Sequence, residues 1–265
     1  MNRMEAGDQV DGARPEVDDR IEREREWHDE RFEGGDSRKL GILYEINRAG
    51  HRWYKDAIDR LPDDALLLDY GCGDHAYCAM YAAERGLRAR AIDLSPAAIE
   101  TARGVAVEHG VADLIEFDVG NAEDLDYADD TFDCVAGLGV IHHLDVDASM
   151  AEIARVLKPG GRADFMEAMG HNPAINAFRR ATPSQRTEDE HPLLMSDLET
   201  MGKYFDRVDA QYLHLLTLAA IPAIGRSRFE GMVARLERAD QALFRRVPAL
   251  KKHAWMVCVE LSGPR

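Results

Sequence analysis

The chain has 265 residues, a length that fits one large α/β domain or a domain with a cap. Its formal net charge of −16 argues against a nucleic-acid partner, because such binding depends on Lys and Arg against phosphate. Hydrophobic residues make up 45% of the chain, which is ordinary for a globular protein with a core. The four cysteines have no CxxC spacing and the N-terminus has no apolar signal core, so we expect reduced thiols and a cytoplasmic location.

Two segments precede the first expected strand. Residues 1–20 are polar and rich in Asp, Gly and Pro, which predicts a disordered tail. Residues 21–60 contain two helical stretches separated by glycines, and the second carries Tyr44, Trp53 and Tyr54. These aromatic side chains either belong to the core or cover a site.

The stretch 65–75, Ala-Leu-Leu-Leu-Asp-Tyr-Gly-Cys-Gly-Asp-His, predicts a strand, a glycine turn and a helix start. This arrangement is typical of a nucleotide-type binding site. A third glycine of the dinucleotide fingerprint is missing, and so is the Gly-Lys-Ser/Thr of a phosphate loop. Asp69, before Gly71 and Gly73, would repel a pyrophosphate and suits a ligand that carries an ammonium group.

A second apparent strand ends at Asp93, about 20 residues past the glycine turn, where an acid can accept both hydroxyls of a ribose. The plainer alternative for both features is a tight turn followed by a solvated acid at a strand end. Ser95-Pro96 then predicts a capped helix start, and Gly110 a helix end.

Strands and helices go on alternating, which predicts a parallel sheet. Residues 115–119 read as a third strand and 131–144 contain a fourth. The next helix places Met150, Ile153, Ala154 and Leu157 on one face and stops at the breaker 158–161, before a fifth strand over 162–168.

Over residues 60–170 these motifs, in this order and spacing, resemble the class I S-adenosylmethionine-dependent methyltransferases of the small-molecule type, which include quinone methyltransferases. The resemblance implies a Rossmann-like α/β fold: a seven-stranded, mostly parallel sheet with the last strand antiparallel and helices on both faces. It also favours a helical lid over 21–60, since methyl transfer must exclude water. We expect the tail over 1–20, the cofactor-binding core over 61–170, and a substrate-side region over 171–265 within the same structural domain.

The resemblance also implies a cofactor site for S-adenosylmethionine. Asp69 would hold the methionine ammonium group, directly or through water, and Asp93 the ribose. Asn121 stands where the family often has Asp beside the adenine amino group, and Leu138 and Gly139 would line the floor beneath the reactive methyl group. The full set implied is Tyr44, Asp69, Gly71, Cys72, Gly73, Asp93, Leu94, Asn121, Ala122, Leu138 and Gly139.

Candidates for catalysis follow the fourth and fifth strands. One of His142 and His143 could be a base or orient the acceptor; alternatively one caps the next helix and the other is packed. Glu167, at the end of the fifth strand, could act in the same way. A metal set of both histidines with Asp145 and Asp147 is chemically conceivable, but adjacent histidines diverge, so no metal site is predicted.

The polar connection 167–192 should face the substrate. Its candidate substrate residues are Arg179, Arg180, Arg186 and His191, and the arginines could bind a carboxylate or phosphate. The alternative is an internal salt-bridge network with Asp189 and Glu190.

The last hundred residues predict a helix over 196–204, a strand over 207–216 and a last strand over 254–261. The apolar stretch 212–224 is too short to span a bilayer, and reads as a buried strand running into an apolar wall. Residues 229–247 form an amphipathic helical insertion where most family members have a short hairpin. That insertion belongs to the substrate region or to a contact in a homo-oligomer.

The sequence therefore predicts methyl transfer to oxygen, carbon or nitrogen of a small, partly hydrophobic acceptor. Two alternatives stay open: a dinucleotide-dependent oxidoreductase, and a cofactor-binding partner subunit without catalysis. The acidic charge disfavours a nucleic-acid methyltransferase.

Overall fold

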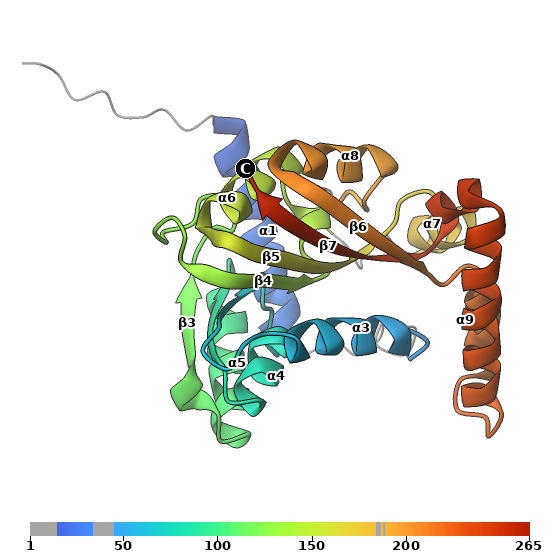
Figure 1. The fold of residues 1–265 in the computed structure, drawn as a ribbon, viewed down its shortest axis with the longest axis horizontal. Coiled ribbons are helices and arrows are strands. Elements are labelled where there is room, and N and C mark those ends of the chain that lie inside the picture. The colour runs from blue at the N-terminus through green and yellow to red at the C-terminus, as the bar shows by residue number, and fades with distance from the viewer. Residues whose placement is uncertain (1–14, 34–44, 184–186, 188) are drawn as a thin grey trace, which may run out of the picture.

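The computed structural model describes residues 15–33, 45–183, 187 and 189–265. A seven-stranded sheet with the order β3-β2-β1-β4-β5-β7-β6 runs through the molecule (Figure 1). Six strands are parallel, and β7 pairs antiparallel with both β5 and β6. The predicted Rossmann-like architecture is confirmed. The strands are β1 Leu66–Tyr70, β2 Arg88–Asp93, β3 Ile115–Val119, β4 Phe132–Leu138, β5 Leu157–Ala168, β6 Phe205–Leu213 and β7 Met256–Pro264.

Helices cover both faces of this sheet. Along β1, Leu67 packs with α3, α4 and α5, whereas Leu68 packs with α6 and α8 on the other face. Because the central strands of a parallel sheet are buried on both faces, β1 and β4 are nearly continuous apolar runs, whereas β3 at the edge alternates apolar and charged residues. The α-helices are α1 Pro15–Glu33, α3 Arg48–Asp59, α4 Tyr77–Glu84, α5 Pro96–Glu108, α6 Val146–Val156, α7 Pro173–Ala181, α8 Met195–Tyr204 and α9 Phe229–Arg246, and the 3-10 turns are η1 Ala112–Leu114, η2 Ile141–His143, η4 Leu216–Ala223 and η5 Pro248–His253.

Local signals set several of these boundaries. The Ser95 hydroxyl accepts a hydrogen bond from the Ala98 N–H at 3.1 Å, with Pro96 in the first turn of α5, so the predicted helix start is confirmed. The breaker at 158–161 does end α6, but Leu157 already pairs with Phe132 of β4. The fifth strand therefore begins five residues earlier than the expected 162, and contains the breaker.

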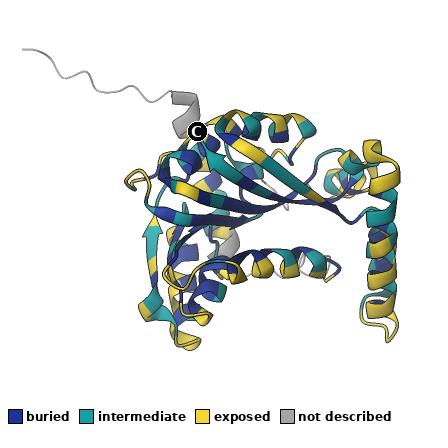
Figure 2. Cartoon of the chain, in the orientation of Figure 1, coloured by how far each residue is buried: buried dark blue, intermediate teal, exposed yellow. Residues whose placement is uncertain are grey.

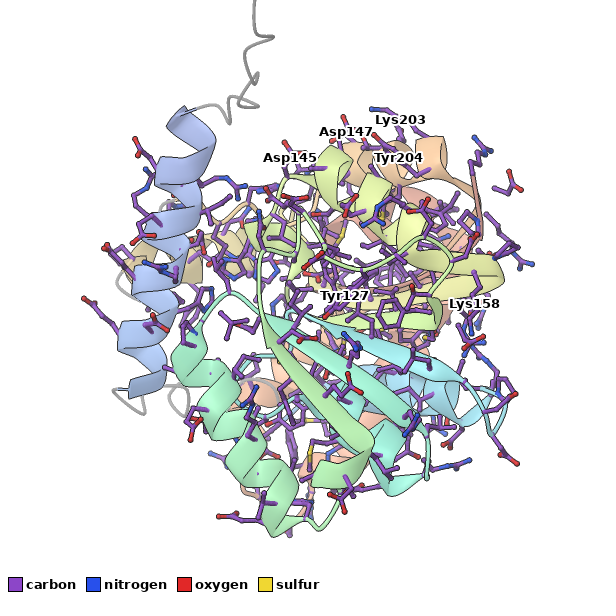
Figure 3. The ribbon with its side chains drawn as sticks, turned by 90° about the vertical axis from the view of Figure 1, so that its left-hand side faces the viewer. Tyr127, Asp145, Asp147, Lys158, Lys203 and Tyr204 are labelled. Carbon is purple, nitrogen blue, oxygen red and sulfur yellow. The ribbon has the colours of Figure 1, made fainter. Side chains whose placement is uncertain are left out.

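The N-terminal boundary differs from the expected one. Residues 15–20, assigned to a disordered tail, form the first turns of α1, which lies beside α5 (Figures 1 and 3). Arg20 donates to Glu123 at 2.6 Å and to the His143 carbonyl at 3.0 Å, contacts that no local sequence pattern reveals. Residues 1–14 and Tyr44 lie outside the described residues.

The expectation of a buried strand over 212–224 was wrong. Strand β6 ends at Leu213, His214 has a φ of 64°, and η4 follows. The cause is Asp240 of α9, whose carboxylate accepts from the N–H groups of Leu215, Leu216 and Thr217 at 3.0, 2.6 and 3.2 Å. These amides are therefore not available to a strand ladder.

The predicted amphipathic helix of the insertion is confirmed as α9. It stands at the far end of the β6–β7 pair (Figure 1), and its surface is mostly exposed or half-buried (Figure 2). Ion pairs from Arg48 to Glu230 and from Arg52 to Glu237 join α3 to α9. No helix in the described part of the chain is long and apolar enough to cross a membrane.

Replacing Asp240 with Ala should destabilise the protein by at least about 2 kcal/mol, because a buried donor left without an acceptor costs about 1–3 kcal/mol. Asp240 is buried and also accepts from the Thr217 hydroxyl at 2.6 Å. Urea unfolding measures the change. Arg238→Ala, an exposed position on the same helix, is the control and should stay within about 0.5 kcal/mol. Equal effects of the two variants would contradict the anchoring role of Asp240.

Candidate functional site

A cavity of about 950 Å3 opens at the carboxyl ends of the parallel strands. Ligands of open α/β sheets bind at this edge, because successive strands bring their following loops together there. The structure gathers most of the predicted cofactor residues in its wall: Gly71, Cys72, Gly73, Asp93, Leu94, Asn121, Ala122, Leu138 and Gly139.

The turn after β1 needs its glycines for backbone reasons. Gly71 and Gly73 have φ angles of 66° and 59°. A Cβ on Gly71 would lie 2.2 Å from Val140 Cγ2, so only glycine lets this turn approach the segment after β4.

Asp93 holds the same turn from the end of β2. Its two carboxylate oxygens accept from the N–H groups of Gly73 at 2.8 Å and Ser95 at 3.0 Å. Burial raises the pKa of Asp93, although these two donors oppose the rise. Each oxygen keeps a lone pair. Since Asp93 also lines the cavity, it can accept hydroxyl groups from a ligand.

Asp69 lies elsewhere than expected. It is buried beneath the turn, and its Oδ2 accepts from the Ala79 N–H of α4 at 2.9 Å. It is not among the residues that line the cavity. The structure therefore gives Asp69 the role of anchoring the first turns of α4, and does not bring its side chain to the ligand space.

Asn121 and Ala122 form the cavity edge after β3. The Asn121 side-chain oxygen already accepts from the Glu123 N–H at 2.9 Å, which leaves one lone pair for a ligand amino group. The Tyr70 hydroxyl donates to the Ala122 carbonyl at 2.6 Å and fixes the edge from below.

The Glu167 carboxylate fixes the orientation of the His142 ring. Glu167 Oε2 lies 2.6 Å from His142 Nδ1, and its Oε1 accepts from the N–H groups of Val140 and Ile141, each at 2.9 Å. Glu167 is fully buried and is not among the residues that line the cavity, so a direct role as a base stays a prediction. It orients His142, which does line the cavity.

The charge on Glu167 also sets the protonation of this histidine. Burial lowers the pKa of His142, but the hydrogen bond and charge of Glu167 outweigh it, and the pKa is raised above 6.5. An ionised carboxylate only accepts, so Nδ1 carries the proton and Nε2 is the ring nitrogen left for a ligand.

His143 also lines the cavity but faces α1. Its Nδ1 is 3.2 Å from Glu24 Oε2, and His28 Nε2 is 3.5 Å from the same oxygen. Burial and the neighbouring His142 lower the pKa of His143 to about 4. Sequence reasoning missed Glu24 and His28; the only signal was their spacing of four on one face of a charged helix.

The alternative helix-capping role for these histidines is excluded by Asp145. Its side chain accepts from the Ala148 N–H at 2.9 Å and caps α6. Asp147 accepts from Lys203 and from the Tyr204 hydroxyl, both at 3.1 Å, and joins α6 to α8 (Figure 3). Neither aspartate turns to the histidines, so the metal set considered from the sequence is not assembled.

The structure brings only some of the predicted substrate residues to the cavity. Arg179 of α7 lines the cavity and donates to the Met169 carbonyl at 3.1 Å. Arg180 is exposed and is not among the residues that line the cavity, so its role toward the substrate stays a prediction. His191 is exposed and likewise away from it, although its N–H donates to the His142 carbonyl at 2.8 Å. Arg186 lies outside the described residues.

The charge network expected inside 167–192 is also different. Among the residues that the structure describes, Asp189 pairs with Arg23 of α1, at 3.0 and 3.1 Å. Glu190 lines the cavity. The segment thus binds the N-terminal helix through Asp189.

An apolar wall completes the cavity opposite the glycine turn. The wall residues come from β4, β5, α7 and the chain entering β7: Leu138, Met166, Ala168, Ile175, Phe178, Trp255 and Met256. Tyr54, expected to cover the site, is buried in the core and Trp53 is half-buried against it, and neither is among the residues that line the cavity. Polar residues of α1 and α3 line the cavity instead, among them Arg20, Glu24, His28, His51 and Lys55.

The pKa of Asp69 predicts a pH effect on stability. Burial raises this pKa from 3.8 to about 7, so the protonated carboxyl contributes stability that is complete below about pH 4 and is lost as pH rises through 7. Asp69→Asn removes the charge. The stability advantage of the variant should grow by about 1.4 kcal/mol per pH unit from 4 to 7 and then level off.

Urea unfolding at pH 5, 6, 7 and 8 measures the effect. Asp63→Asn, in the exposed loop before β1, is the control and should show no such trend. An advantage of Asp69→Asn that is constant across this range would mean that Asp69 ionises normally.

The sequence of this chain is similar to those of known methyltransferases. Residues 68–165 match the family described as Methyltransferase domain. The methyltransferase GfsG of Streptomyces halstedii is 38% identical over 120 residues, which are 44% of this chain and 43% of the relative. The ubiquinone/menaquinone biosynthesis C-methyltransferase UbiE of Nitrobacter hamburgensis is 33% identical over 136 residues, 48% of this chain and 54% of the relative. The chain thus spans about half the length of the curated relatives it matches.

A solved structure shows the same fold. Geranyl diphosphate C-methyltransferase from Streptomyces coelicolor A3(2) superposes with a TM-score of 0.59 at 17% identity, covering 83% of this chain and 80% of the other. The matched segment runs from β1 into β5 and contains the glycine turn, Asp93 and Asn121. The segment over residues 68–165 therefore matches a methyltransferase domain.

Proposed function

We propose that this chain transfers a methyl group from S-adenosylmethionine to a small, partly hydrophobic acceptor. One observation carries the proposal: a single cavity is lined on one side by the cofactor motifs and on the other by the apolar wall. His142 lines the same cavity, and its Nδ1 is hydrogen-bonded to Glu167.

The donor set of the cavity fits this cofactor. Gly71 and Gly73 leave the turn without side chains, Asp93 offers acceptors for vicinal hydroxyls, and Leu94 supplies apolar surface for a base. The cofactor, when bound, supplies an electrophilic methyl group. Asp74 lines the cavity within the turn, and the third glycine of the dinucleotide fingerprint is missing, which disfavours the pyrophosphate of a dinucleotide and so the oxidoreductase alternative.

His142 is the residue that we assign to proton removal. Glu167 fixes the ring so that the neutral form presents Nε2 as an acceptor. A base is needed only when the acceptor must lose a proton, as a hydroxyl of high pKa does. On an acceptor that is already nucleophilic, His142 would orient rather than deprotonate.

The apolar wall supports a hydrophobic acceptor, and Arg179 would receive an anionic group on it. Two similar proteins have names of this kind: one acts in ubiquinone and menaquinone biosynthesis, and one structure holds geranyl diphosphate. The net charge of −16 disfavours a nucleic-acid acceptor.

We assign α1 and α3 to a lid over the site. Besides the contacts of Arg20 and Arg23, the Ser95 hydroxyl donates to Asp29 and so fastens α1 to the start of α5. A closed lid would exclude water from the sulfonium displacement. The four cysteines are buried free thiols, in keeping with a cytoplasmic location. The exposed surface of α9 is the part of the insertion that a homo-oligomer would use.

Asp93→Asn should weaken the binding of S-adenosylhomocysteine at least tenfold, because a charge-assisted hydrogen bond is worth about 1.5–3 kcal/mol. Calorimetry measures the affinity. Asp113→Asn, exposed in η1, should bind like the parent. In the same assay, Asp69→Asn should bind normally if Asp69 only anchors α4. An unchanged affinity of Asp93→Asn would remove the main support for this cofactor site.

His142→Gln should lower the rate of methyl transfer by about 10²–10⁴, the usual contribution of a positioned base. Cofactor affinity should stay within about twofold, since His142 makes no hydrogen bond to the glycine turn or Asp93. Transfer of a labelled methyl group to a panel of hydroquinones, prenylated phenols and polyketide-type phenols measures the rate. His109→Gln, at an exposed histidine, is the control. A His142→Gln rate within a few-fold of the parent would assign this residue to structure.

A further inference from the structure

We propose that Glu24, His28 and His143 form a binding site for one late first-row divalent metal ion, of which Zn2+ is the type, between α1 and η2. The three side chains each offer one ligand atom, and these atoms lie within 4.8 Å of one another. This site differs from the set of both histidines, Asp145 and Asp147 that was considered from the sequence. The two sets have only His143 in common.

The first support is the state of the Glu24 carboxylate. Glu24 is only 4% exposed, on a helix whose other described side chains are half-buried or exposed. Neither carboxylate oxygen has a hydrogen-bond partner among the described residues, and His143 Nδ1 has none either. A buried carboxylate that has two histidine nitrogens nearby but no aligned hydrogen bond is costly, and a bound cation would compensate its charge.

The second support is the spacing of the ligand atoms. Glu24 Oε2 is 3.2 Å from His143 Nδ1 and 3.5 Å from His28 Nε2. Charge-assisted hydrogen bonds between such groups are shorter, about 2.7–2.9 Å. A tetrahedral ion with bonds of about 2.0–2.2 Å holds neighbouring ligand atoms about 3.3–3.6 Å apart. The cluster has the dimensions of a coordination edge more than those of a hydrogen bond.

The types of ligand atom indicate which metal ion the site would bind. Two imidazoles and one carboxylate suit Zn2+ and similar ions, whereas Mg2+ and Ca2+ prefer sites made of oxygen alone. Three protein ligands leave a fourth position. All three residues line the cavity, so that position opens onto it.

A second group of possible ligand residues extends the cluster toward His142. Ligand atoms of His142, His143 and Glu190 form a second group within 4.8 Å, which shares His143 with the first. His142 Nδ1 is already bound to Glu167, so only its Nε2 could contribute. The metal would thus join α1 to the segment that carries the catalytic candidate, and hold the lid closed by coordination.

Calorimetric titration of the chelator-treated full chain with Zn2+, without cofactor, tests the site. We expect one equivalent of Zn2+ to bind, and Glu24→Gln and His28→Asn each to weaken it at least tenfold, as loss of one ligand should. Mg2+ should not bind. His109→Asn, an exposed histidine paired with Glu84, is the matched control and should titrate like the parent.

Co2+ provides a second measurement, because its visible absorption becomes strong when the ion is held in a four-coordinate site. The band should appear in the parent and be lost in His28→Asn, whose side chain is 22% exposed and whose replacement leaves the core intact. This variant keeps the test decisive if Glu24→Gln fails to fold.

Two results would overturn the site: no Zn2+ binding to the parent, or equal binding to the parent and both ligand variants. The outcome is independent of the proposed function. A chain that binds S-adenosylhomocysteine but not Zn2+ loses only the metal site, and a chain that binds Zn2+ but not S-adenosylhomocysteine loses only the methyl-transfer proposal.

Discussion

The carboxylate of Glu167, at the end of β5, is the interaction on which the site depends. It accepts from two consecutive backbone N–H groups after β4 and from His142, so one buried charge fixes the whole segment that follows that strand. Val140, held in this way, is the residue against which Gly71 packs. The position of the cofactor turn and the orientation of His142 therefore have a common origin.

Acidic residues play this part throughout the fold. Asp69, Asp93 and Asp240 are buried, or line the cavity, and each accepts from backbone N–H groups at the end of a strand or the start of a helix. Such carboxylates replace the hydrogen bonds that irregular backbone would otherwise lack. Part of the acidic surplus of the chain is thus internal, and it stabilises the loops that form the cavity.

Local patterns predicted the parts of the structure that local forces determine. Apolar runs located the central strands β1 and β4, and Ser95-Pro96 located a helix start, because burial and capping act within a few residues. Glu167 behind His142, Asp240 beneath η4 and Glu24 against His143 join residues far apart in the chain. No window of sequence contains both partners, so the contact of Glu167 with His142, the end of β6 and the contacts of α1 were misjudged or missed.

The position of the insertion, between two strands at one edge of the sheet, affects which part of the cavity can vary. Strands β6 and β7 lie at the edge of the sheet away from β1 and β2, and α9 with its flanking turns lies between them in the chain. Trp255 and Met256, just after the insertion, line the cavity, whereas Gly71 and Asp93 belong to the opposite half. Changes in the insertion can therefore reshape the wall that β7 contributes to the cavity, while the glycine turn and Asp93 stay constant at the other half of the sheet.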